Sequence, residues 1–437
     1  MLKRISESRV MRIVLILLAI FVVVAFIPLY ANGISYGATY KTYTISPTSK
    51  PCSKTLRNYS TYNSKTKHYY LLRSYMEKFE KAGGGTLVLK KGTYNIPVTV
   101  YIPSNVTIKL SNGVKLNKTS TTGTSKIKYS KSMFMLCAPS KSKVANKYKT
   151  GKYKNGYTKY NGVKNVKIIG TGTTVVDMNY LKGGLGVEMA HTKNVTFSNI
   201  YFKESNTSHF LEIDASYNVN VTGCTFKSAK NAAGNAKEAI NLDTPDLNTG
   251  GFTAPWSSFD KTADKNITIS NCKFYDLYRS IGTHNYSYGH PHENITISNC
   301  TIKNMKSDAI SAMYWKNSTI KDNTISNIAE GKNYRAILGP GTDNITITGN
   351  TFSNMDRVAQ FYSWKDDGYS LIDANITEDN ISNIASGNNT YTDVNESFIR
   401  ISSGWDSNAN TPDWGNNEKV SLTSKLFNKI SYALSQL

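Results

Sequence analysis

The sequence lacks the features of a helical protein. Only 19% of its 437 residues are charged. No apolar pattern of helical period, about 10–15 residues long, lies between its short apolar segments. These absences argue against a helical enzyme and against leucine-rich or helical repeats. Asn, Ser, Thr and Tyr are abundant instead, and this composition favours short strands joined by polar turns.

Acidic residues are also scarce. Asp and Glu number 30 against 52 Lys and Arg, so the formal net charge is +22. The stretch 119–165 contains eleven lysines and no acidic residue. We call this stretch the basic loop. It is either simply solvated, or it attracts the chain to an anionic cell wall, or it clamps an anionic polysaccharide. Its lysines are Lys126, Lys128, Lys131, Lys141, Lys143, Lys147, Lys149, Lys152, Lys154, Lys159 and Lys164.

Residues 1–38 are typical of a signal peptide or an N-terminal membrane anchor. Lys3, Arg4, Arg9 and Arg12 precede an uncharged apolar run at 13–29, and small residues follow it. We favour a cleaved signal over an anchor. Either one predicts a secreted or cell-surface protein. With export and no nucleic-acid recognition motif, no nucleic acid is expected as a partner.

One short phrase recurs along the chain and predicts the fold. "KNITISNCKF" begins at Lys265 and "ENITISNCTI" at Glu293. Aliphatic residues tend to lie one and three positions after the Asn, so each phrase reads as a strand with one buried face. Repeats of short strands at this period predict a solenoid, and a parallel β-helix fits best. The other phrases open at Asn105, Asn165, Asn194, Asn218, Asn317 and Asn344, and from Asn165 the spacings are 29, 24, 48, 28, 23 and 27.

The chain has only five cysteines, so the odd count leaves at least one thiol free. Cys224, Cys272 and Cys300 each fall six residues after the Asn of their phrase, where Asn323 and Asn350 fall in later repeats. We expect these three to be stacked, buried thiols in one column of the solenoid.

The N-terminal part carries a resemblance to a known group. Residues 69–82 have the apolar stripe of a helix, and "GGGTLVLKKGTYNIPVTVYIPSNVTIKL" follows from Gly83. This order resembles the pectin-lyase-like superfamily of right-handed β-helix proteins, over roughly residues 65–400. It implies one all-β domain at 39–415, a right-handed parallel β-helix with capping helices at 69–82 and 416–437. The superfamily includes hydrolases, lyases, epimerases and non-catalytic adhesins, so the fold leaves the chemistry open.

The second strand of each repeat carries the polar residues of interest. When GVEMAH (186–191), FLEIDA (210–215), AINLDT (239–244) and SIGTHN (280–285) are aligned, alternation sends every second residue outward. One outward column is then Glu188, Glu212, Asn241 and Gly282, and the next is Ala190, Asp214, Asp243 and His284. We therefore expect Glu212, Asp214, Asp243 and His284 to cluster on one outer face.

These residues suggest three functions. In a glycoside hydrolase, Asp214 and Asp243, or Glu212, supply the acid and the base. In a polysaccharide lyase or uronate epimerase, His284 abstracts a proton beside a carboxylate that Arg279 or a Ca²⁺ ion neutralises. No other cofactor or metal is expected. The third function is a non-catalytic surface module that binds glycans or the cell wall. We favour the hydrolase, with an anionic polysaccharide as partner.

A 20-residue insertion at 245–264 explains the single spacing of 48. We expect it to wall a groove, with Trp256 stacking on a sugar ring. Trp315 and Lys316 are expected to extend the floor of that groove as substrate-binding residues. Packing against neighbouring turns is the alternative for these aromatic residues.

A further column lies at the start of these strands: His209, Glu238, Arg279, Asp308 and Arg335. Its alternating charges predict an ion-pair ladder. In layout the region resembles polygalacturonases, whose catalytic Asp and His residues occupy this position, but only Glu238 keeps a carboxylate and Arg279 replaces the histidine. Glu238 is therefore a further catalytic candidate, and Arg279, His209 and Asn241 are substrate-binding candidates. The sequence leaves the direction of these strand-start side chains open.

Overall fold

The structure is a computed structural model, and it describes eleven stretches of the chain. These are residues 40–143, 156–230, 237–247, 249–252, 254–287, 289–329, 334–365, 375–376, 384–406, 411–413 and 418–420. The predicted export segment, with its apolar run at 13–29, lies outside the described residues. Among the residues that are described, no helix is both long enough and apolar enough to cross a membrane.

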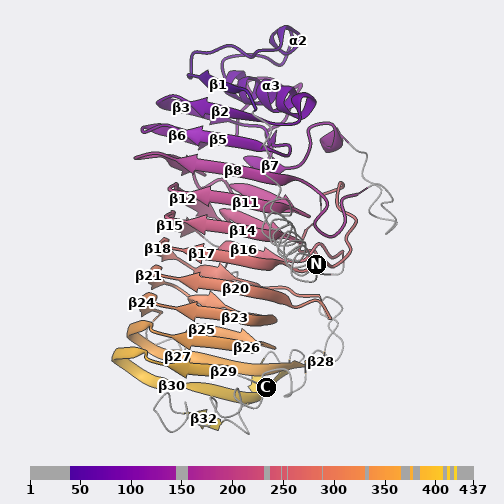
Figure 1. Ribbon diagram of the computed structural model, residues 1–437. Helices are drawn as coiled ribbons and strands as arrows, with labels where there is room; N and C mark the ends of the chain where they lie inside the picture. The colour runs from indigo at the N-terminus through magenta and orange to yellow at the C-terminus, as the bar shows by residue number, and fades with distance from the viewer. Residues whose placement is uncertain are drawn as a thin grey trace, which may run out of the picture. The chain divides into compact units, whose positions relative to one another are not determined.

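The repeated phrases form one parallel sheet of eleven strands, which we call the anchor sheet (Figure 1). Neighbouring strands of this sheet come from successive coils. They are β1 (Thr42–Ile45), β2 (Gly85–Leu89), β5 (Val106–Leu110), β8 (Lys164–Gly170), β11 (Lys193–Ser198), β14 (Tyr217–Thr222), β17 (Lys265–Ser270), β20 (His292–Ser298), β23 (Trp315–Lys321), β26 (Asp343–Thr348) and β29 (Ile384–Gly387).

The candidate residues lie on a second set of parallel strands, which we call the site strands. They are β4 (Val100–Tyr101), β7 (Phe134–Leu136), β10 (Val187–Ala190), β13 (Leu211–Asp214), β16 (Glu238–Asp243), β19 (Arg279–Gly282), β22 (Ile310–Ser311) and β25 (Arg335–Pro340).

A third set of strands completes each coil. It contains β3 (Gly92–Ile96), β6 (Val114–Lys118), β9 (Val175–Asp177), β12 (Tyr201–Asn206), β15 (Thr225–Lys230), β18 (Lys273–Leu277), β21 (Thr301–Met305) and β24 (Thr324–Ile328). The long strands β27 (Thr351–Lys365) and β30 (Thr390–Asp406) continue the stack. The short strands β28 (Asn375–Ile376), β31 (Thr411–Asp413) and β32 (Glu418–Val420) pair antiparallel with them.

The described helices lie at the N-terminal end. Besides α2 (Lys54–Arg57) and a 3₁₀ turn at Lys141–Lys143, there is α3 (Lys67–Ala82), which contains the helix expected at 69–82. It ends at Gly83, whose φ of 77° is the left-handed conformation that glycine adopts without strain. Its role as a cap stays a prediction. Of the helix expected at 416–437, Glu418–Val420 is a strand and 421–437 lie outside the described residues.

The repeated asparagine has a backbone reason. In all eight phrases this residue has a positive φ, between 49° and 60°. Asparagine is one of the few residues with a side chain that adopts this conformation readily. Its amide also bonds to the matching asparagine of the preceding coil, as from Asn165 to Asn105 (2.8 Å) and from Asn344 to Asn317 (2.7 Å). The phrase recurs because each coil needs the same turn.

The cysteine column is confirmed. Cys224, Cys272 and Cys300 are buried and free, and they belong to the main core. In the next coils Asn323 and Asn350 continue the column, and their side-chain oxygens accept the backbone N–H of the preceding coil at 2.9 and 3.0 Å. Either residue type therefore fills the same buried place.

Candidate functional site

The outward columns have the register that the sequence predicts. Glu212 pairs with Glu188 on one side and with Asn241 on the other, and Asp214 pairs with Asp243. The alternating residues Leu211, Ile213, Ile240 and Leu242 are fully buried in the main core. The alignment also holds across the 48-residue spacing, because β14 and β17 pair in register. Stacking therefore brings residues far apart in sequence onto one face.

That face is covered, which corrects the expectation of an exposed carboxylate cluster. The exposed fraction is 6% for Glu212 and 0% for Asp214 and Asp243. The insertion lies directly on Asp243: a Cβ atom at Gly251 would come within 2.7 Å of the Asp243 carboxyl carbon. The sequence pattern predicts the direction of a side chain from its strand, but it does not show which loop folds back over it.

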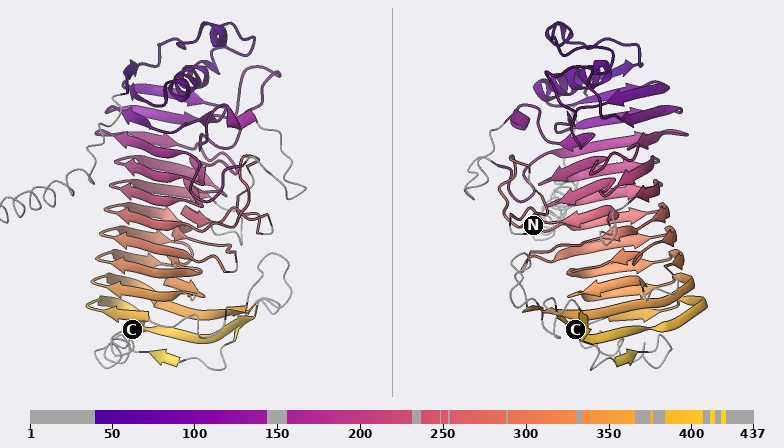
Figure 2. Two further views of the ribbon diagram at one scale, coloured as in Figure 1. Left: turned by 45° about the vertical axis from the view of Figure 1, so that its right-hand side comes forward. Right: turned by 180° about the vertical axis from the view of Figure 1, so that it is seen from behind.

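The insertion is fixed to the basic loop, and both lie on the same side of the coils (Figure 2). Tyr157 N–H donates to the Trp256 carbonyl at 2.8 Å, and Ser258 N–H donates to the Tyr157 carbonyl at 3.0 Å. His191 Nε2 lies 2.8 Å from Ser257 Oγ. The described parts of the loop thus form a cover together with the insertion. Residues 144–155, with Lys147, Lys149, Lys152 and Lys154, lie outside the described residues.

The prediction that Trp256 stacks on a sugar is wrong for this structure. Trp256 is 1% exposed and packs with Phe252, Ala190 and Cys137 in a small apolar cluster. Its ring meets the Tyr157 ring edge-on at 5.8 Å. It is therefore the apolar contact that attaches the insertion to the sheet.

The predictions for Trp315 and Lys316 are also wrong, because both belong to β23 of the anchor sheet. Trp315 is 0% exposed, and its Nε1–H donates to Thr283 Oγ1 at 2.9 Å. Lys316 forms an ion pair with Asp343 of the next anchor strand at 3.3 Å. Alternation along β23 turns Trp315 into the core, so neither residue can form a groove floor beside His284.

The ion-pair ladder at the strand starts is confirmed. Arg279 Nη1 lies 2.5 Å from Glu238 Oε1, and Arg279 Nη2 lies 3.6 Å from Asp308 Oδ2. The next coil adds Arg335, whose Nε lies 2.8 Å from Asp308 Oδ1. Glu238 is fully buried. The direction left open by the sequence is thereby determined, because these side chains stack on one another along the axis.

His284 turns toward the ladder and joins Glu238. Its Nδ1 lies 3.1 Å from Glu238 Oε2 and 3.1 Å from Asn241 Oδ1, while Lys237 Nζ lies 3.0 Å from its Nε2. The rings of His284 and His209 stack at 5.5 Å. The His284 side chain is 23% exposed. His284 is therefore partly exposed to solvent and at the same time bonded to the buried carboxylate of Glu238.

Lys237 is a site residue that sequence reasoning missed. It precedes Glu238 at the turn before β16, where strand alternation does not apply. The "KE" of "KEAINL" was the available signal, since a cation and a carboxylate are adjacent there. The contact between Lys237 and His284 depends on the backbone path of residues 283–285, which follow the end of β19.

The electrostatics of the two acidic groups differ. Burial alone would raise the pKa of Glu238, but its electrostatic interactions with His284 and Arg279 and its hydrogen bond to His284 outweigh burial and hold that pKa well below its usual range. Burial lowers the pKa of His209 to about 3, so His209 is neutral. Its Nδ1 lies 2.7 Å from the Glu238 carbonyl, which can only accept, so Nδ1 carries the proton.

Glu212, Asp214 and Asp243 form the second group. Burial raises the pKa of all three carboxyls, and the charge of Asp243 adds to the effect at Glu212. Asn241 links the two groups, because its Nδ2 donates to Glu212 Oε1 at 2.8 Å. The arrangement of ligand atoms would allow a metal ion at either group, at His209, Glu238 and His284 or at the three carboxylates.

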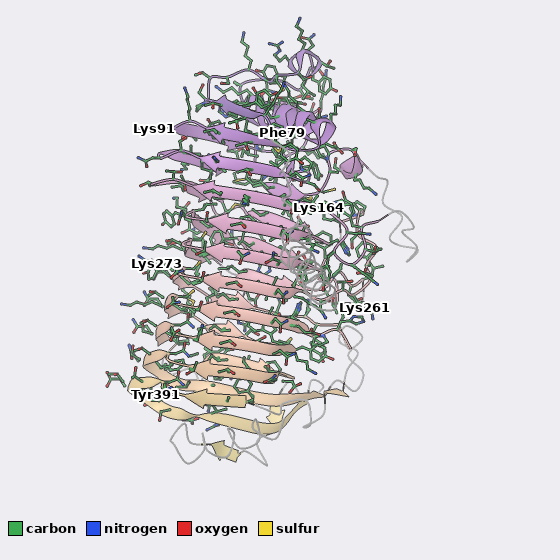
Figure 3. All side chains as sticks on the ribbon, viewed as in Figure 1. Phe79, Lys91, Lys164, Lys261, Lys273 and Tyr391 are labelled. Atoms are coloured by element: carbon green, nitrogen blue, oxygen red, sulfur yellow. The ribbon has the colours of Figure 1, made fainter. Side chains whose placement is uncertain are left out.

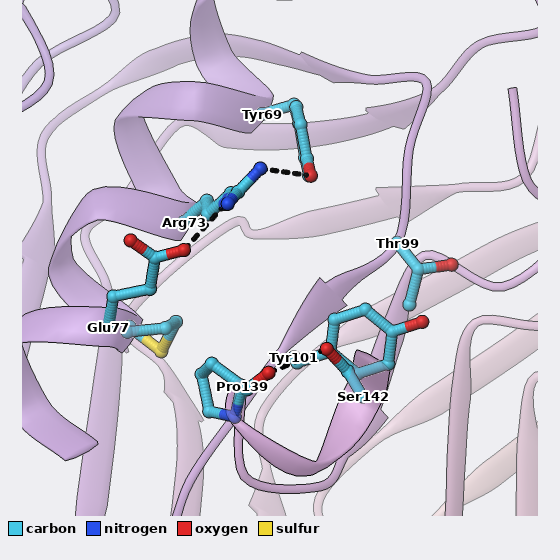
Figure 4. A pocket seen from close by; sticks show the side chains of 8 residues that line it. Tyr69, Arg73, Glu77, Thr99, Tyr101, Pro139 and Ser142 are labelled. Atoms are coloured by element: carbon cyan, nitrogen blue, oxygen red, sulfur yellow. Dashed lines mark hydrogen bonds and ion pairs between the residues drawn. The ribbon is translucent and has the colours of Figure 1, made fainter. Parts of the chain in front are cut away.

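A separate pocket of about 220 Å³ lies between α3 and the first coils (Figure 4). Arg73 crosses it, with Nε 2.7 Å from Glu77 Oε1 and Nη1 3.3 Å from the Tyr69 hydroxyl. Tyr101 and Ser142 line the opposite side. None of the residues predicted for the site lies in this pocket.

Comparisons with known proteins agree on the fold. The family model described as "Right handed beta helix region" matches residues 259–411. Two structures of the surface adhesin PfbA of Streptococcus pneumoniae are similar at 16% identity and a TM-score of 0.51, and they cover 82% and 87% of this chain and 99% and 96% of theirs. A mutant tailspike protein of E. coli bacteriophage HK620, in complex with a pentasaccharide, is similar at 12% identity and a TM-score of 0.52, over 83% of this chain and 61% of that one.

No curated protein matches the chain. The family model and the solved structures show that it is a right-handed parallel β-helix. This is the fold that the resemblance to the pectin-lyase-like superfamily implies. At these identities the likeness concerns the fold alone.

Proposed function

We propose that the chain acts outside the cytoplasm on an acidic polysaccharide, with His284 as the base that removes a proton beside a uronate carboxylate. The observation that supports this most is the order Glu238, His284, Lys237. A fully buried carboxylate lies behind a partly exposed histidine, and a cation lies in front of it.

Glu238 sets the state of the histidine. Its ionised carboxylate accepts the Nδ1–H of His284 at 3.1 Å, so Nε2 presents its lone pair toward Lys237 and solvent. A carboxylate behind an imidazole also stabilises the imidazolium that forms when the proton is taken. Arg279 holds Glu238 from the other side at 2.5 Å, so the base rests on a fixed support.

Lys237 supplies the charge that recognises the substrate. Its ammonium donates to His284 Nε2, and within the described ranges it forms no ion pair with a carboxylate. We infer that a bound uronate carboxylate draws the ammonium away, which frees Nε2. A neutralised carboxylate makes loss of the adjacent proton less costly, because the charge that develops on it is stabilised.

The lyase and the epimerase share this first step and differ in the second. In the lyase, Nε2 takes the C5 proton, the C–H electrons form the C4=C5 bond, and the C4–O bond breaks with its electrons on the leaving oxygen, which water protonates. In the epimerase, a proton returns to C5 from the opposite face and no bond in the chain is broken. The products distinguish them.

Charge and the fold neighbours support the acidic polysaccharide. Lysines are spread over the coils, with Lys91 and Lys273 on one side and Lys164 and Lys261 on the other (Figure 3), and the whole chain is +22. The neighbours described as a surface adhesin and as a tailspike bound to a pentasaccharide support a glycan partner and an extracellular or surface location for this chain too.

The hydrolase prediction loses its proposed acid and base, because Asp214 and Asp243 are 0% exposed beneath the insertion. A non-catalytic glycan-binding module is the second candidate. The observation that favours it is the adhesin, whose structure covers 82% of this chain.

The experiment is a polysaccharide panel of polygalacturonate, alginate and a glucuronate-containing glycosaminoglycan, with neutral dextran as the control. Unsaturated uronates are followed by absorbance, epimerisation by NMR and reducing ends by a colour assay. We expect unsaturated uronates or an inverted uronate from one acidic polymer. Reducing ends without unsaturation would instead indicate hydrolysis. Binding without any product would leave the adhesin-like module.

A further inference from the structure

Three buried carboxylates are not used by the proposed function. Glu212 and Asp214 are the outward residues of β13, and Asp243 is the last residue of β16. All three are more than nine-tenths buried. Carboxylate oxygens from each lie within 4.8 Å of one another. Three like charges packed this closely, away from water, are strongly unfavourable unless something neutralises them.

The described residues do not provide that neutralisation. Neither oxygen of Asp214 has a hydrogen-bond partner, and neither does Asp243 Oδ2. His209 Nε2 lies 3.5 Å from Glu212 Oε2, while its Nδ1 bonds to the Glu238 carbonyl at 2.7 Å. No lysine or arginine within the described ranges forms an ion pair with these carboxylates.

We propose that Glu212, Asp214 and Asp243 bind a calcium ion beneath the insertion. The unpartnered Asp214 oxygens and Asp243 Oδ2 supply free ligand atoms, and Glu212 retains lone pairs beside its bond to Asn241. An all-oxygen set suits a hard divalent cation and not zinc, which prefers nitrogen and sulfur ligands.

The spacing permits calcium, and the irregular ligand set favours it over magnesium, which demands near-ideal octahedral geometry. Two oxygens on one Ca²⁺ can be separated by up to about 5 Å, which is twice the Ca–O distance. The ligand atoms here lie within 4.8 Å of one another, inside the calcium limit. Calcium also accepts irregular coordination, which suits ligands from two strands.

The ion would attach the insertion to the sheet. Asp243 is the last residue of β16, and the insertion begins two residues later. Gly251 then passes directly over the Asp243 carboxylate. A cation at Asp243 therefore holds the base of the insertion, away from solvent and from any polysaccharide. The inference does not depend on the proposed reaction.

The test uses the full chain, dialysed against EDTA and then against CaCl₂ or MgCl₂. We expect elemental analysis to find one tightly held Ca²⁺ per chain. We expect Ca²⁺ to raise the melting temperature by a few °C, since a ligand of the native state stabilises it, with a smaller rise in Mg²⁺. Cleavage within 249–252 by a protease should be faster in EDTA than in Ca²⁺.

Two variants decide the location. Asp214→Asn should lose both the bound calcium and the melting shift. Asp276→Asn is the matched control and should keep both, because Asp276 is 44% exposed and matches asparagines of later coils. A wild-type chain that retains no Ca²⁺ and shows no shift would overturn the proposal, and so would an Asp214→Asn chain that binds calcium as the wild type does. No readout involves a polysaccharide, so this outcome is separate from that of the panel.

Discussion

Two groups of buried charge lie side by side on β13, β16 and β19, and they are neutralised in different ways. In the ladder, each charge meets an opposite one: Glu238 meets Arg279, and Arg279 meets Asp308. In the carboxylate group, Glu212, Asp214 and Asp243 face one another with no cation of the described chain among them. The ladder is complete within the protein, whereas the carboxylate group requires a partner from outside.

The two groups should respond differently when one charged side chain is replaced. A buried pair broken on one side costs several kcal/mol, because a charge is left without its partner. A buried cluster of one sign gains when a charge is removed or a counter-ion is added. Substitutions of equal size in the two groups should therefore change stability in opposite directions.

The largest effect is expected at the exposed edge of the ladder. His284→Ala removes the proposed base, and general-base catalysis contributes roughly 10²–10⁴-fold to a rate. We expect kcat on the substrate found in the panel to fall by that factor, with little change in melting temperature. His290→Ala is the control, since His290 is a half-buried neighbour outside the site. Near-normal turnover in His284→Ala would place the chemistry elsewhere.

Breaking the ladder from within should destabilise the fold. Glu238→Ala leaves Arg279, 12% exposed, without its 2.5 Å partner. We expect a loss of about 3–5 kcal/mol in the free energy of unfolding, the usual cost of breaking a buried pair. Urea denaturation measures it. A loss below about 0.5 kcal/mol, typical of a surface change, would show that the ladder is solvated.

Relieving the carboxylate group should do the opposite. In EDTA, we expect Asp214→Asn to raise the free energy of unfolding by about 1–2 kcal/mol, within the range that stabilising substitutions give. The reason is that one of three crowded buried acids becomes neutral. Adding Ca²⁺ should then make the wild type the more stable of the two. Destabilisation by Asp214→Asn in EDTA would contradict the absence of a partner for these oxygens.

Lys118 offers a third case, because its buried ammonium bonds to backbone carbonyls and not to charged groups within the described residues. Lys118 Nζ is buried and donates to the carbonyls of Pro97 and Ser132 at 3.2 and 3.0 Å. Burial lowers its pKa to about 7, below the roughly 10.4 of an unfolded chain. Between these values the unfolded state binds more protons, so stability should rise with pH above 7, by about 1 kcal/mol per unit. In Lys118→Met that slope should disappear from pH-dependent melting curves.

The sequence predicted the fold and the register, because the coil repeats a local rule. An asparagine in the left-handed conformation followed by alternating aliphatic residues fixes each anchor strand, and stacking then aligns Asp214 with Asp243. The burial of that face was not predictable in the same way. It depends on an insertion that has no periodic pattern from which burial could be read. For this reason Trp256 was expected at the surface, whereas it lies in a small apolar cluster separate from the main core.

The position of Lys237 and the turn of His284 toward Glu238 were likewise beyond the pattern. Both residues lie just outside strands, at turns where alternation gives no direction. The contact between Lys237 and His284 depends on the paths of turns in two successive coils, and the repeat pattern does not specify these paths.

The unbroken register across the insertion has an evolutionary consequence. Tyr217 pairs with Lys265 and Val219 with Ile267, although 48 residues separate the two strands. A single insertion or deletion event in the turn after Asp243 can therefore exchange the insertion while the neighbouring coils keep their pairing. Descendants of one ancestral solenoid could diverge in ligand by replacing this segment, and the same turn is a natural graft site for an engineered loop.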